Sequence, residues 1–396
     1  MKARYLLAGI AAAALLAPAA QAETVKVGMM MPFSGPTADN GKQLNRGIEL
    51  FIKHHPNVPG GHKIEIINRD TTGPNPEVAK RLATELVTRD KVQILAGIIY
   101  SPNAFAVNDI CEKAKVPFLI MNAGTASITE GCKYNARISF TMWQAGYPMG
   151  DYAFKKMGVK NAAVVYANYA PGKDSVAGFQ RAFEAAGGKI VADVPVTYPN
   201  MPDFTPFMQR VKDSKPDAVY VFVPAGKWAT AVMKTYGDLG MEAAGIKLIG
   251  PGDITQDSEL PNMGDVPLGV VTVHHYSAAA TRPENKDFVA KWKAAYGDDQ
   301  VPDFLGVQGW DGMAAIYHVV EKTNGKVTAE SFLEAMKSWR YNSPRGPISI
   351  DPETRDIVDN QYIRKVEKVN GVVSNVEFDT IPNVKDPWKA FGKDKK

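Results

Sequence analysis

Short apolar runs alternate with segments of helical periodicity from residue 25 onward. The apolar run at 25–31 predicts a strand, and residues 38–54 then carry Leu44, Ile48 and Ile52 at the spacing of one helix face. The same alternation predicts strands at 63–68, 92–98 and 116–121 and helices at 76–89 and 104–115. This order is typical of βαβ units, which build a parallel sheet with right-handed crossovers.

The alternation begins again after residue 140. A helix is expected to end near residue 157, followed by strands at 162–166, 189–196, 218–223 and 246–249 and helices at 174–186, 204–214 and 227–239. The tail predicts helices at 284–296, 304–323 and 328–339 and then strands at 348–350, 361–369 and 371–376. Helices followed by strands fit a chain that returns to complete the first sheet and then the second.

These patterns predict an α/β fold made of two doubly wound parallel-sheet lobes. Lobe I is expected to comprise residues 23–141 and 275–347, and lobe II residues 142–274 and 348–396. A chain of 396 residues is too long for one compact core, which also favours two domains. Several crossings between lobes would act as a hinge, with a ligand bound in the cleft between them.

The first 22 residues have the organisation of a cleavable export signal. Lys2 and Arg4 precede an apolar stretch at 5–17, and Ala20-Gln21-Ala22 offers the small residues that signal peptidase requires. The apolar stretch is shorter than the roughly 20 residues that cross a bilayer, so we expect cleavage after Ala22 rather than a membrane anchor. Since no cysteine lies near that point, the mature protein is expected to be free in the periplasm.

The net charge limits the class of binding partner, and the cysteine content limits the possible disulfides. Cleavage would remove two positive charges and lower the formal net charge from +4 to +2, which argues against a nucleic-acid partner. Export permits a disulfide between Cys111 and Cys132, but sequence spacing cannot supply the Cα geometry that a bridge needs. The sequence therefore leaves that bridge open.

Motifs for catalysis and cofactor binding are missing from the sequence. It has no phosphate-binding G-x-x-x-x-G-K-[ST] loop, no dinucleotide fingerprint after the first strand, no G-x-S-x-G and no H-E-x-x-H. The adjacent pairs His54-His55 and His274-His275 point their rings in different directions, so neither is suited to chelation. We expect no cofactor, no metal site and no enzymatic activity.

Small and hydroxyl-bearing residues follow two neighbouring strands of the first predicted sheet. The third strand ends at Tyr100-Ser101, and the fourth leads into Asn122-Ala123-Gly124-Thr125. Ligands of open α/β sheets bind at the edge formed by the carboxyl ends of the strands. Helix N-termini there attract anions, and hydroxyl groups add hydrogen-bond donors. A carboxylate site is predicted here; the alternative is that Ser101 and Thr125 only cap helices.

The second predicted sheet offers partners at the corresponding edge. Its strands lead into segments 166–172, 223–228 and 250–253, which contain Tyr169, Trp228 and Asp253. The two rings could cover an aromatic or apolar ligand body, although each could equally be a core residue.

Several motifs resemble the leucine/isoleucine/valine-type periplasmic binding proteins, the type I substrate-binding subunits of ABC importers. The resemblance begins at residues 25–50 and covers essentially all of the chain after the export signal. Its further matches are Asp70-Thr-Thr-Gly-Pro-Asn-Pro76, the loops at Ser101 and Asn122, Gly250-Pro-Gly252, Val307-Gln-Gly-Trp-Asp311 and Ser343-Pro-Arg-Gly-Pro347. This family implies a three-stranded hinge and a clamshell that closes on its ligand and docks on a membrane permease.

The resemblance also assigns ligand contacts. It implies that Ser101, Ala123 and Thr125 hold a carboxylate. At the position where the family usually places an acid for the ligand amine, this chain has Gly252, with Asp253 one residue later. A stacking ring of the family is replaced by Asn40, and a second-lobe tyrosine falls near Pro171.

Five motifs most resemble the branch of the family that binds aromatic acids such as hydroxybenzoates: Asn122-Ala-Gly124, Tyr169-Ala-Pro-Gly-Lys173, Gly250-Pro-Gly252, Val307-Gln-Gly-Trp-Asp311 and Ser343-Pro-Arg-Gly-Pro347. A planar acid without an amine would need no counter-acid at position 252. We therefore expect a monomeric ligand-delivery protein for an aromatic carboxylate, with an inner-membrane ABC permease as its partner. The alternatives are a branched-chain or other aliphatic amino acid as ligand, and a sensor that docks on a receptor.

Overall fold

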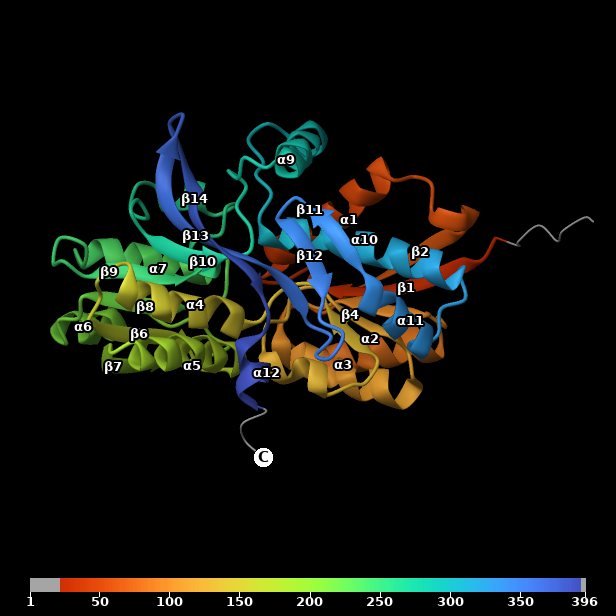
Figure 1. The fold of residues 1–396 in the computed structure, drawn as a ribbon, viewed down its shortest axis with the longest axis horizontal. Coiled ribbons are helices and arrows are strands. Elements are labelled where there is room, and N and C mark those ends of the chain that lie inside the picture. Colours follow the sequence, from red (N-terminus) through yellow and green to blue (C-terminus); the bar gives the residue numbers. More distant parts are fainter. Residues whose placement is uncertain (1–21, 393–396) are drawn as a thin grey trace, which may run out of the picture.

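The computed structural model describes residues 22–392 and shows two α/β halves side by side (Figure 1). Nearly all of the predicted export signal lies outside the described residues. The first half holds a five-stranded parallel sheet in the order β2-β1-β3-β4-β5. Its strands are β1 (Thr24–Met31), β2 (Lys63–Asp70), β3 (Ile94–Gly97), β4 (Phe118–Ile120) and β5 (Asn135–Arg137).

Helices cover both faces of this sheet, which explains why β3 and β4 are wholly buried. Alternate residues of β1 pack against α1 (Ala38–His54) and α10 (Phe304–Thr323). The opposite face packs against α2 (Pro76–Thr88) and α3 (Ser101–Ala114). The predicted return of the tail to the first half is confirmed, since α10 and α11 (Ala329–Ser338) join this core.

The second sheet has the order β11-β12-β13-β10-β9-β8-β6-β7, with β14 paired to β13. Its strands β6 to β10 lie in the second half, whereas β12 and the start of β13 pack on the core of the first half, where Figure 1 shows β11 and β12 beside α10 and α11. The strands from β7 to β10 are parallel, and β13 runs antiparallel to β10. These strands are β6 (Asn161–Ala167), β7 (Lys189–Val196), β8 (Ala218–Phe222), β9 (Lys247–Pro251), β10 (Val271–His274), β11 (Arg340–Ser343), β12 (Gly346–Ile350), β13 (Ile357–Val369) and β14 (Val372–Val384).

Two pairs of helices cover the faces of this second sheet. On one face lie α4 (Met142–Lys155) and α5 (Ala170–Ala185), and on the other α6 (Thr205–Asp213) and α7 (Lys227–Asp238). The remaining helices are α8 (Leu260–Met263), α9 (Pro283–Tyr296) and α12 (Pro387–Gly392), and α12 lies between the two halves in Figure 1. The predicted α/β fold of two parallel-sheet lobes is therefore confirmed.

One buried arginine ties together the segments that connect the lobes. Arg345 donates to the carbonyls of Ile138 and Ser139 (2.8 Å for Ser139), lies 3.2 Å from His275 Nδ1 and pairs with Asp359 on β13 at 3.4 Å. These partners come from three separate passages of the chain between the halves. The hinge is thus three-stranded, while the exact lobe boundaries at 141/142, 274/275 and 347/348 stay a prediction.

The structure settles the disulfide that the sequence left open. Cys111 on α3 is bonded to Cys132, with their Cα atoms 6.2 Å apart. Both cysteines are buried beside the core between α2, α3 and the first sheet. The bridge ties α3 to the segment that follows the Thr125 loop.

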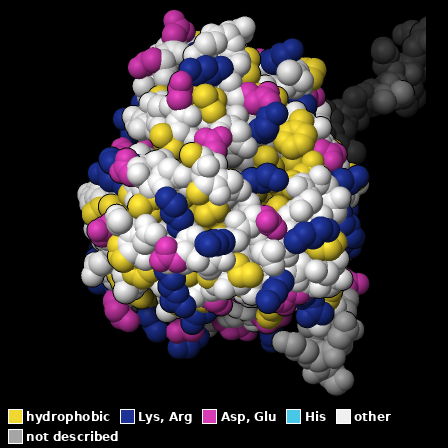
Figure 2. Space-filling view, turned by 90° about the vertical axis from the view of Figure 1, so that its left-hand side faces the viewer, with side chains coloured by type: hydrophobic (Ala, Val, Ile, Leu, Met, Phe, Trp, Pro, Cys, Tyr) yellow, Lys and Arg dark blue, Asp and Glu magenta, His cyan; other side chains and the backbone are white. Residues whose placement is uncertain are grey.

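The surface of the second lobe carries acidic and basic side chains intermixed with isolated apolar ones (Figure 2). Within residues 22–392, no helix is long and apolar enough to cross a membrane. In the same range no group of three or more His, Cys, Asp or Glu side chains is placed to hold a metal ion.

Candidate functional site

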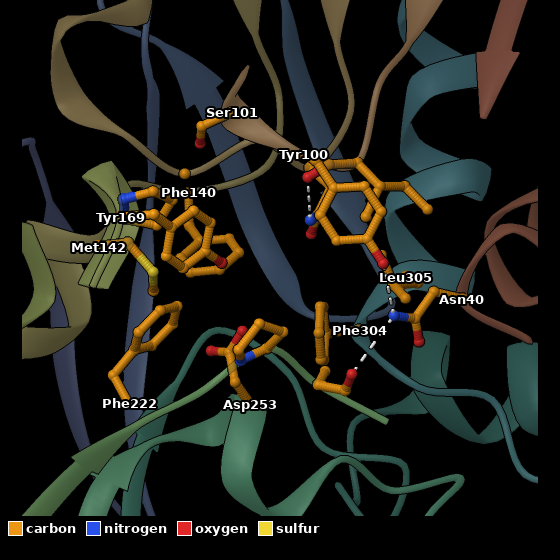
Figure 3. Close-up of a pocket in the computed structure, with 16 residues that line it drawn as sticks. Asn40, Tyr100, Ser101, Phe140, Met142, Tyr169, Phe222, Asp253, Phe304 and Leu305 are labelled. Atoms are coloured by element: carbon orange, nitrogen blue, oxygen red, sulfur yellow. Dashed lines mark hydrogen bonds between the residues drawn. The ribbon is translucent and has the colours of Figure 1, made fainter. Parts of the chain in front are cut away.

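A cavity lies between the lobes, at the carboxyl ends of strands from both sheets. Segments that follow β3 and β4 line it from the first lobe, and segments that follow β6, β8 and β9 line it from the second. Ser101 and Asp253 lie on opposite sides of this cavity with aromatic rings between them (Figure 3). This is the sheet edge at which the sequence predicts a ligand.

At the first-lobe end, Ser101 lines the cavity, whereas Thr125 is buried next to Ser101 and is not part of the lining; neither hydroxyl caps a helix. Ser101 is the first residue of α3, and its Oγ accepts the Thr125 N–H at 3.2 Å, which leaves its own proton free to donate. Thr125 precedes a short 3-10 helix, makes no side-chain cap bond, and its buried Oγ1 has no partner among the described residues. The capping alternative is therefore wrong for both residues.

Tyr100, Asn122 and Ala123 occupy different places around that end. Tyr100 and Asn122 line the cavity, and the Asn122 side chain donates to the Ile99 carbonyl at 2.9 Å. Ala123 is fully buried behind the lining, and its N–H already donates to the Ile98 carbonyl at 3.3 Å. Ala123 thus shapes the loop, and its N–H is occupied by a backbone bond.

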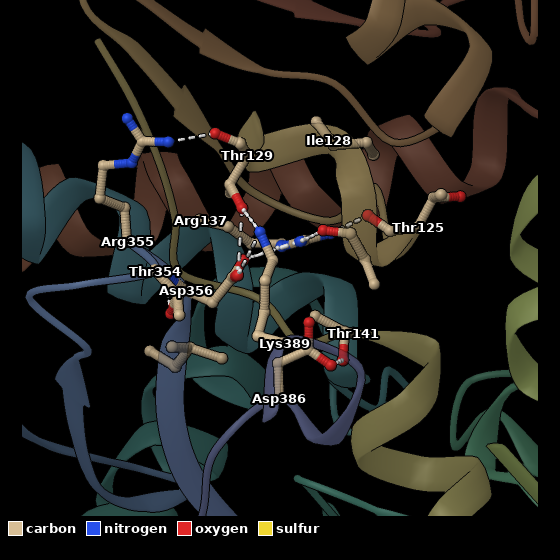
Figure 4. A network of polar contacts seen from close by, with 12 residues as sticks. Thr125, Ile128, Thr129, Arg137, Thr141, Thr354, Arg355, Asp356, Asp386 and Lys389 are labelled. Carbon is tan, nitrogen blue, oxygen red and sulfur yellow. Dashed lines mark hydrogen bonds and ion pairs between the residues drawn. The ribbon is translucent and has the colours of Figure 1, made fainter. Parts of the chain in front are cut away.

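A fully buried arginine supports the same loop from behind (Figure 4). Arg137 donates to the carbonyls of Ala123 at 2.8 Å, Thr125 at 2.7 Å and Ala126 at 3.2 Å, and pairs with Asp356 at 2.7 Å. Because buried charge-assisted bonds have strong geometric preferences, this pairing fixes the direction in which the loop presents Thr125.

The C-terminal segment adds to this support. Lys389 on α12 donates to the Thr129 hydroxyl at 2.8 Å and lies 3.8 Å from Asp356. Asp386 accepts from the Thr141 hydroxyl at 3.1 Å. Burial, together with the nearby Asp356 carboxylate, raises the pKa of Asp386 to about 7.

Apolar side chains form the walls between the two ends. Phe140 and Phe304 lie with ring centroids 6.4 Å apart, and Tyr169 lies 6.2 Å from Phe222 and stacks at 3.9 Å on Tyr198. The remaining wall residues are Ile99, Met142, Pro171, Pro224 and Leu305. Sequence reasoning found Tyr169 but missed the three phenylalanines, Met142 and Leu305, which have the pattern of ordinary core residues.

Asp253 forms the polar end of the cavity in the second lobe. It follows β9, is 8% exposed, and its Oδ2 is buried with no hydrogen-bond partner in residues 22–392. His274 Nε2 lies 3.9 Å from this oxygen. Burial raises the pKa of Asp253 to about 7, against the opposing effect of the Arg364 guanidinium.

Arg364 explains why position 252 has no side chain. A Cβ at Gly252 would lie 2.2 Å from Arg364 Nη2 and 2.6 Å from the His274 Cβ. Arg364 is held by the hydroxyls of Thr272 at 3.1 Å and Thr255 at 3.2 Å, with Asp257 at 3.7 Å. A cation therefore takes the place beside the backbone where the resemblance leads one to expect an acid.

Contacts between the lobes close the cavity. Asn40 donates from α1 to the Tyr100 hydroxyl at 3.3 Å and across the cleft to the Ala225 carbonyl at 3.4 Å. The Ala126 N–H donates across the cleft to Asp174 at 2.8 Å. Trp228 lies outside this closure and lines an outer hollow, where it packs against Tyr198 and Phe204 with ring centroids 6.0 Å away.

Comparison with known proteins identifies the family to which this fold and cavity belong. A sequence profile described as "Periplasmic binding protein" matches residues 24–371. The chain belongs to the periplasmic binding protein family. Over 97% of its length it is 41% identical to Leu/Ile/Val-binding protein homolog 6 of Brucella melitensis, of which it covers 98%.

Two solved structures extend the comparison. One is a solute-binding protein of an ABC transporter from Rhodopseudomonas palustris BisB5 in complex with 3,4-dihydroxybenzoic acid. It is 48% identical with a TM-score of 0.89, and the match covers 92% of this chain and 99% of that one. The second is a solute-binding protein from R. palustris in complex with 4-hydroxybenzoate. It is 40% identical with a TM-score of 0.88, and the match covers 94% of this chain and 100% of that one. The resemblance to the Leu/Ile/Val type and its aromatic-acid branch is confirmed, and the protein is a periplasmic ABC solute-binding protein. Its relatives are solute-binding proteins rather than enzymes.

Proposed function

We propose that this periplasmic binding protein captures an aromatic carboxylate between its lobes and delivers it to an inner-membrane ABC permease. The observation that carries the proposal is the apolar slot that Phe140, Phe222 and Phe304 form between two polar ends. A planar acid can bury both ring faces against such walls. Relatives that hold 3,4-dihydroxybenzoic acid and 4-hydroxybenzoate support the same ligand class.

Each end of the ligand would meet a different lobe. We assign the ligand carboxylate to the hydroxyls of Ser101 and Thr125, which are donors without a cationic side chain. Tyr100, Asn122 and Tyr169 would contact the ring, and Trp228 would stand at the outer rim of the cleft. Ala123 would act through the shape of its loop.

Ligand binding would drive closure by population shift, because only the closed form lets one molecule touch both lobes. The contacts from Asn40 to Ala225 and from Asp174 to Ala126 would form in that state. A change from about 1:99 to 99:1 requires roughly 5.5 kcal/mol of differential binding, which a few charge-assisted hydrogen bonds and ring burial can supply.

The location and partner form part of the proposal. We infer export by the signal at residues 1–22, release into the periplasm as a monomer, and docking of the closed form on a permease. Amino-terminal sequencing of the periplasmic fraction should begin at Glu23. A mature protein that retained the signal, or carried a lipid, would contradict this part.

The ligand class is tested by titration calorimetry with benzoate, 4-hydroxybenzoate and 3,4-dihydroxybenzoate against leucine, isoleucine and valine. We expect binding of one or more benzoates and none of the amino acids. Branched-chain amino acids are the second candidate, because the Asp253 carboxyl could hold an ammonium and the Brucella relative is named for Leu/Ile/Val. Leucine binding without benzoate binding would establish that candidate instead.

A further inference from the structure

We propose that Asp253 makes this site select for a hydroxyl group on the ligand, at the ring position opposite the carboxylate. The inference rests on the proposed function, since it presupposes a carboxylate at the Ser101 end. Asp253 lines the cavity across from Ser101 (Figure 3), so a ring whose carboxylate meets Ser101 directs its far position toward Asp253.

The geometry shows a polar group in need of a partner. Asp253 Oδ2 is buried, and no described residue donates to it; His274 Nε2 lies 3.9 Å away, beyond hydrogen-bond length. Leaving such an oxygen unpaired is costly, so a ligand that offers a hydrogen bond there gains affinity that an unsubstituted ring cannot.

The charges around Asp253 favour a hydroxyl over an ammonium. The groups that act on it or feel its charge are Arg364, His274, Tyr169 and Tyr220. Arg364 is the cation among them, since burial holds the pKa of His274 well below its usual value. An ammonium bound to Asp253 would therefore lie close to a buried positive charge, which disfavours it.

Protonation points the same way. Because burial raises the pKa of Asp253 to about 7, both its ionised and its neutral form are populated near neutral pH. A phenolic hydroxyl can donate to a carboxylate and accept from a carboxylic acid, so it matches both forms. An ammonium can only donate and requires the ionised form.

The test compares affinities for 4-hydroxybenzoate and benzoate in the wild type, Asp253→Ala and Asp253→Asn by titration calorimetry at pH 7. We expect the wild type to prefer 4-hydroxybenzoate by about 10- to 100-fold. Asp253→Ala should reduce this preference to about threefold or less, mainly through weaker binding of 4-hydroxybenzoate. Asp253→Asn keeps the shape of the side chain and should give an intermediate ratio.

Asp39→Asn is the matched control, because Asp39 is an exposed acid that lines the outer hollows but not the ligand cavity. It should leave the ratio unchanged. The inference is overturned if the wild type shows no hydroxyl preference, or if the ratio stays at its wild-type value in both Asp253 variants. The proposed function fails separately, if the wild type binds leucine and neither benzoate.

Discussion

A buried arginine lies behind each end of the ligand cavity, yet the two ends present opposite chemistry to a ligand. At the first-lobe end, Arg137 is paired with Asp356 and its other donors hold backbone carbonyls, so its charge is satisfied within the protein, and the lining there includes the Ser101 hydroxyl. At the second-lobe end, Arg364 binds hydroxyls and pairs with Asp257 at 3.7 Å, and the lining carries Asp253, whose Oδ2 has no partner among the described residues.

This difference separates two kinds of selectivity. The first-lobe end suits any carboxylate, because donors held by a rigid loop recognise charge and little else. The second-lobe end depends on the far substituent of the ligand, because Asp253 needs a partner and Arg364 disfavours a cation. The two ends can therefore be altered independently.

The largest effect is expected from Arg137→Met, which removes the support of the first-lobe end. Asp356 and three carbonyls would lose their buried partner, and breaking a buried pair in this way typically costs about 3–5 kcal/mol. Urea unfolding of the ligand-free protein should show this loss. Lys80→Met, which breaks an exposed pair with Asp109, should cost far less, because solvent screens such a pair. Similar losses in the two variants would show that Arg137 is not a structural support.

Ser101→Ala combined with Thr125→Val should affect binding and spare the fold. Affinity for any bound benzoate should fall by about 10- to 100-fold as the carboxylate loses its donors. The unfolding midpoint of the ligand-free protein should fall only modestly: Ser101→Ala leaves the buried Thr125 N–H without its acceptor, while Thr125→Val removes a hydroxyl that is unpaired within the described chain. If affinity were unchanged, the carboxylate would lie elsewhere.

The sequence predicted the lobes well because their strands and helices are amphipathic or wholly buried over many residues. The predicted helices at 38–54 and 304–323 and the strand at 189–196 match α1, α10 and β7 to the residue. No separate strand was predicted for β5 or β10, which are three and four residues long and lie next to the hinge. Segments this short carry too little periodicity to be recognised.

Sequence reasoning identified residues near the cavity only where they lie in loops that directly follow a strand. The Ser101 and Thr125 loops follow strands directly, so the sheet edge places them. The walls were missed because Phe140, Phe222 and Phe304 come from three distant segments that meet only in the folded protein. Trp228 was placed too far inward, since nothing in the sequence shows that Tyr198 and Phe204 hold its ring at the outer side.

Asp386→Asn tests whether the support of the first-lobe end is sensitive to pH. A folded-state pKa of about 7, above the ordinary value of 3.8, means that the folded protein holds this proton more tightly. Asp386 therefore makes stability fall as pH rises from about 4 to 7, with Asp356 repelling it and Arg137 attracting it. Asp386→Asn should raise the free energy of unfolding clearly more at pH 8 than at pH 5, because at pH 5 only part of the fall between about pH 4 and 7 has occurred. An equal change at both pH values would assign the effect to packing.

The smallest effect is expected from Asn40→Ala, which leaves both ends of the cavity intact and removes a contact between the lobes. Asn40 donates to the Tyr100 hydroxyl in one lobe and to the Ala225 carbonyl in the other, both at hydrogen-bond lengths near the upper limit. Such bonds contribute about 0.5–1.5 kcal/mol, so affinity for every ligand should fall by the same factor of roughly 3–10. Stopped-flow measurements should place the change in the dissociation rate, because the closed form opens more readily. The preference for 4-hydroxybenzoate over benzoate should not change, and a change in that preference would mean that the ends of the cavity and its closure cannot be separated.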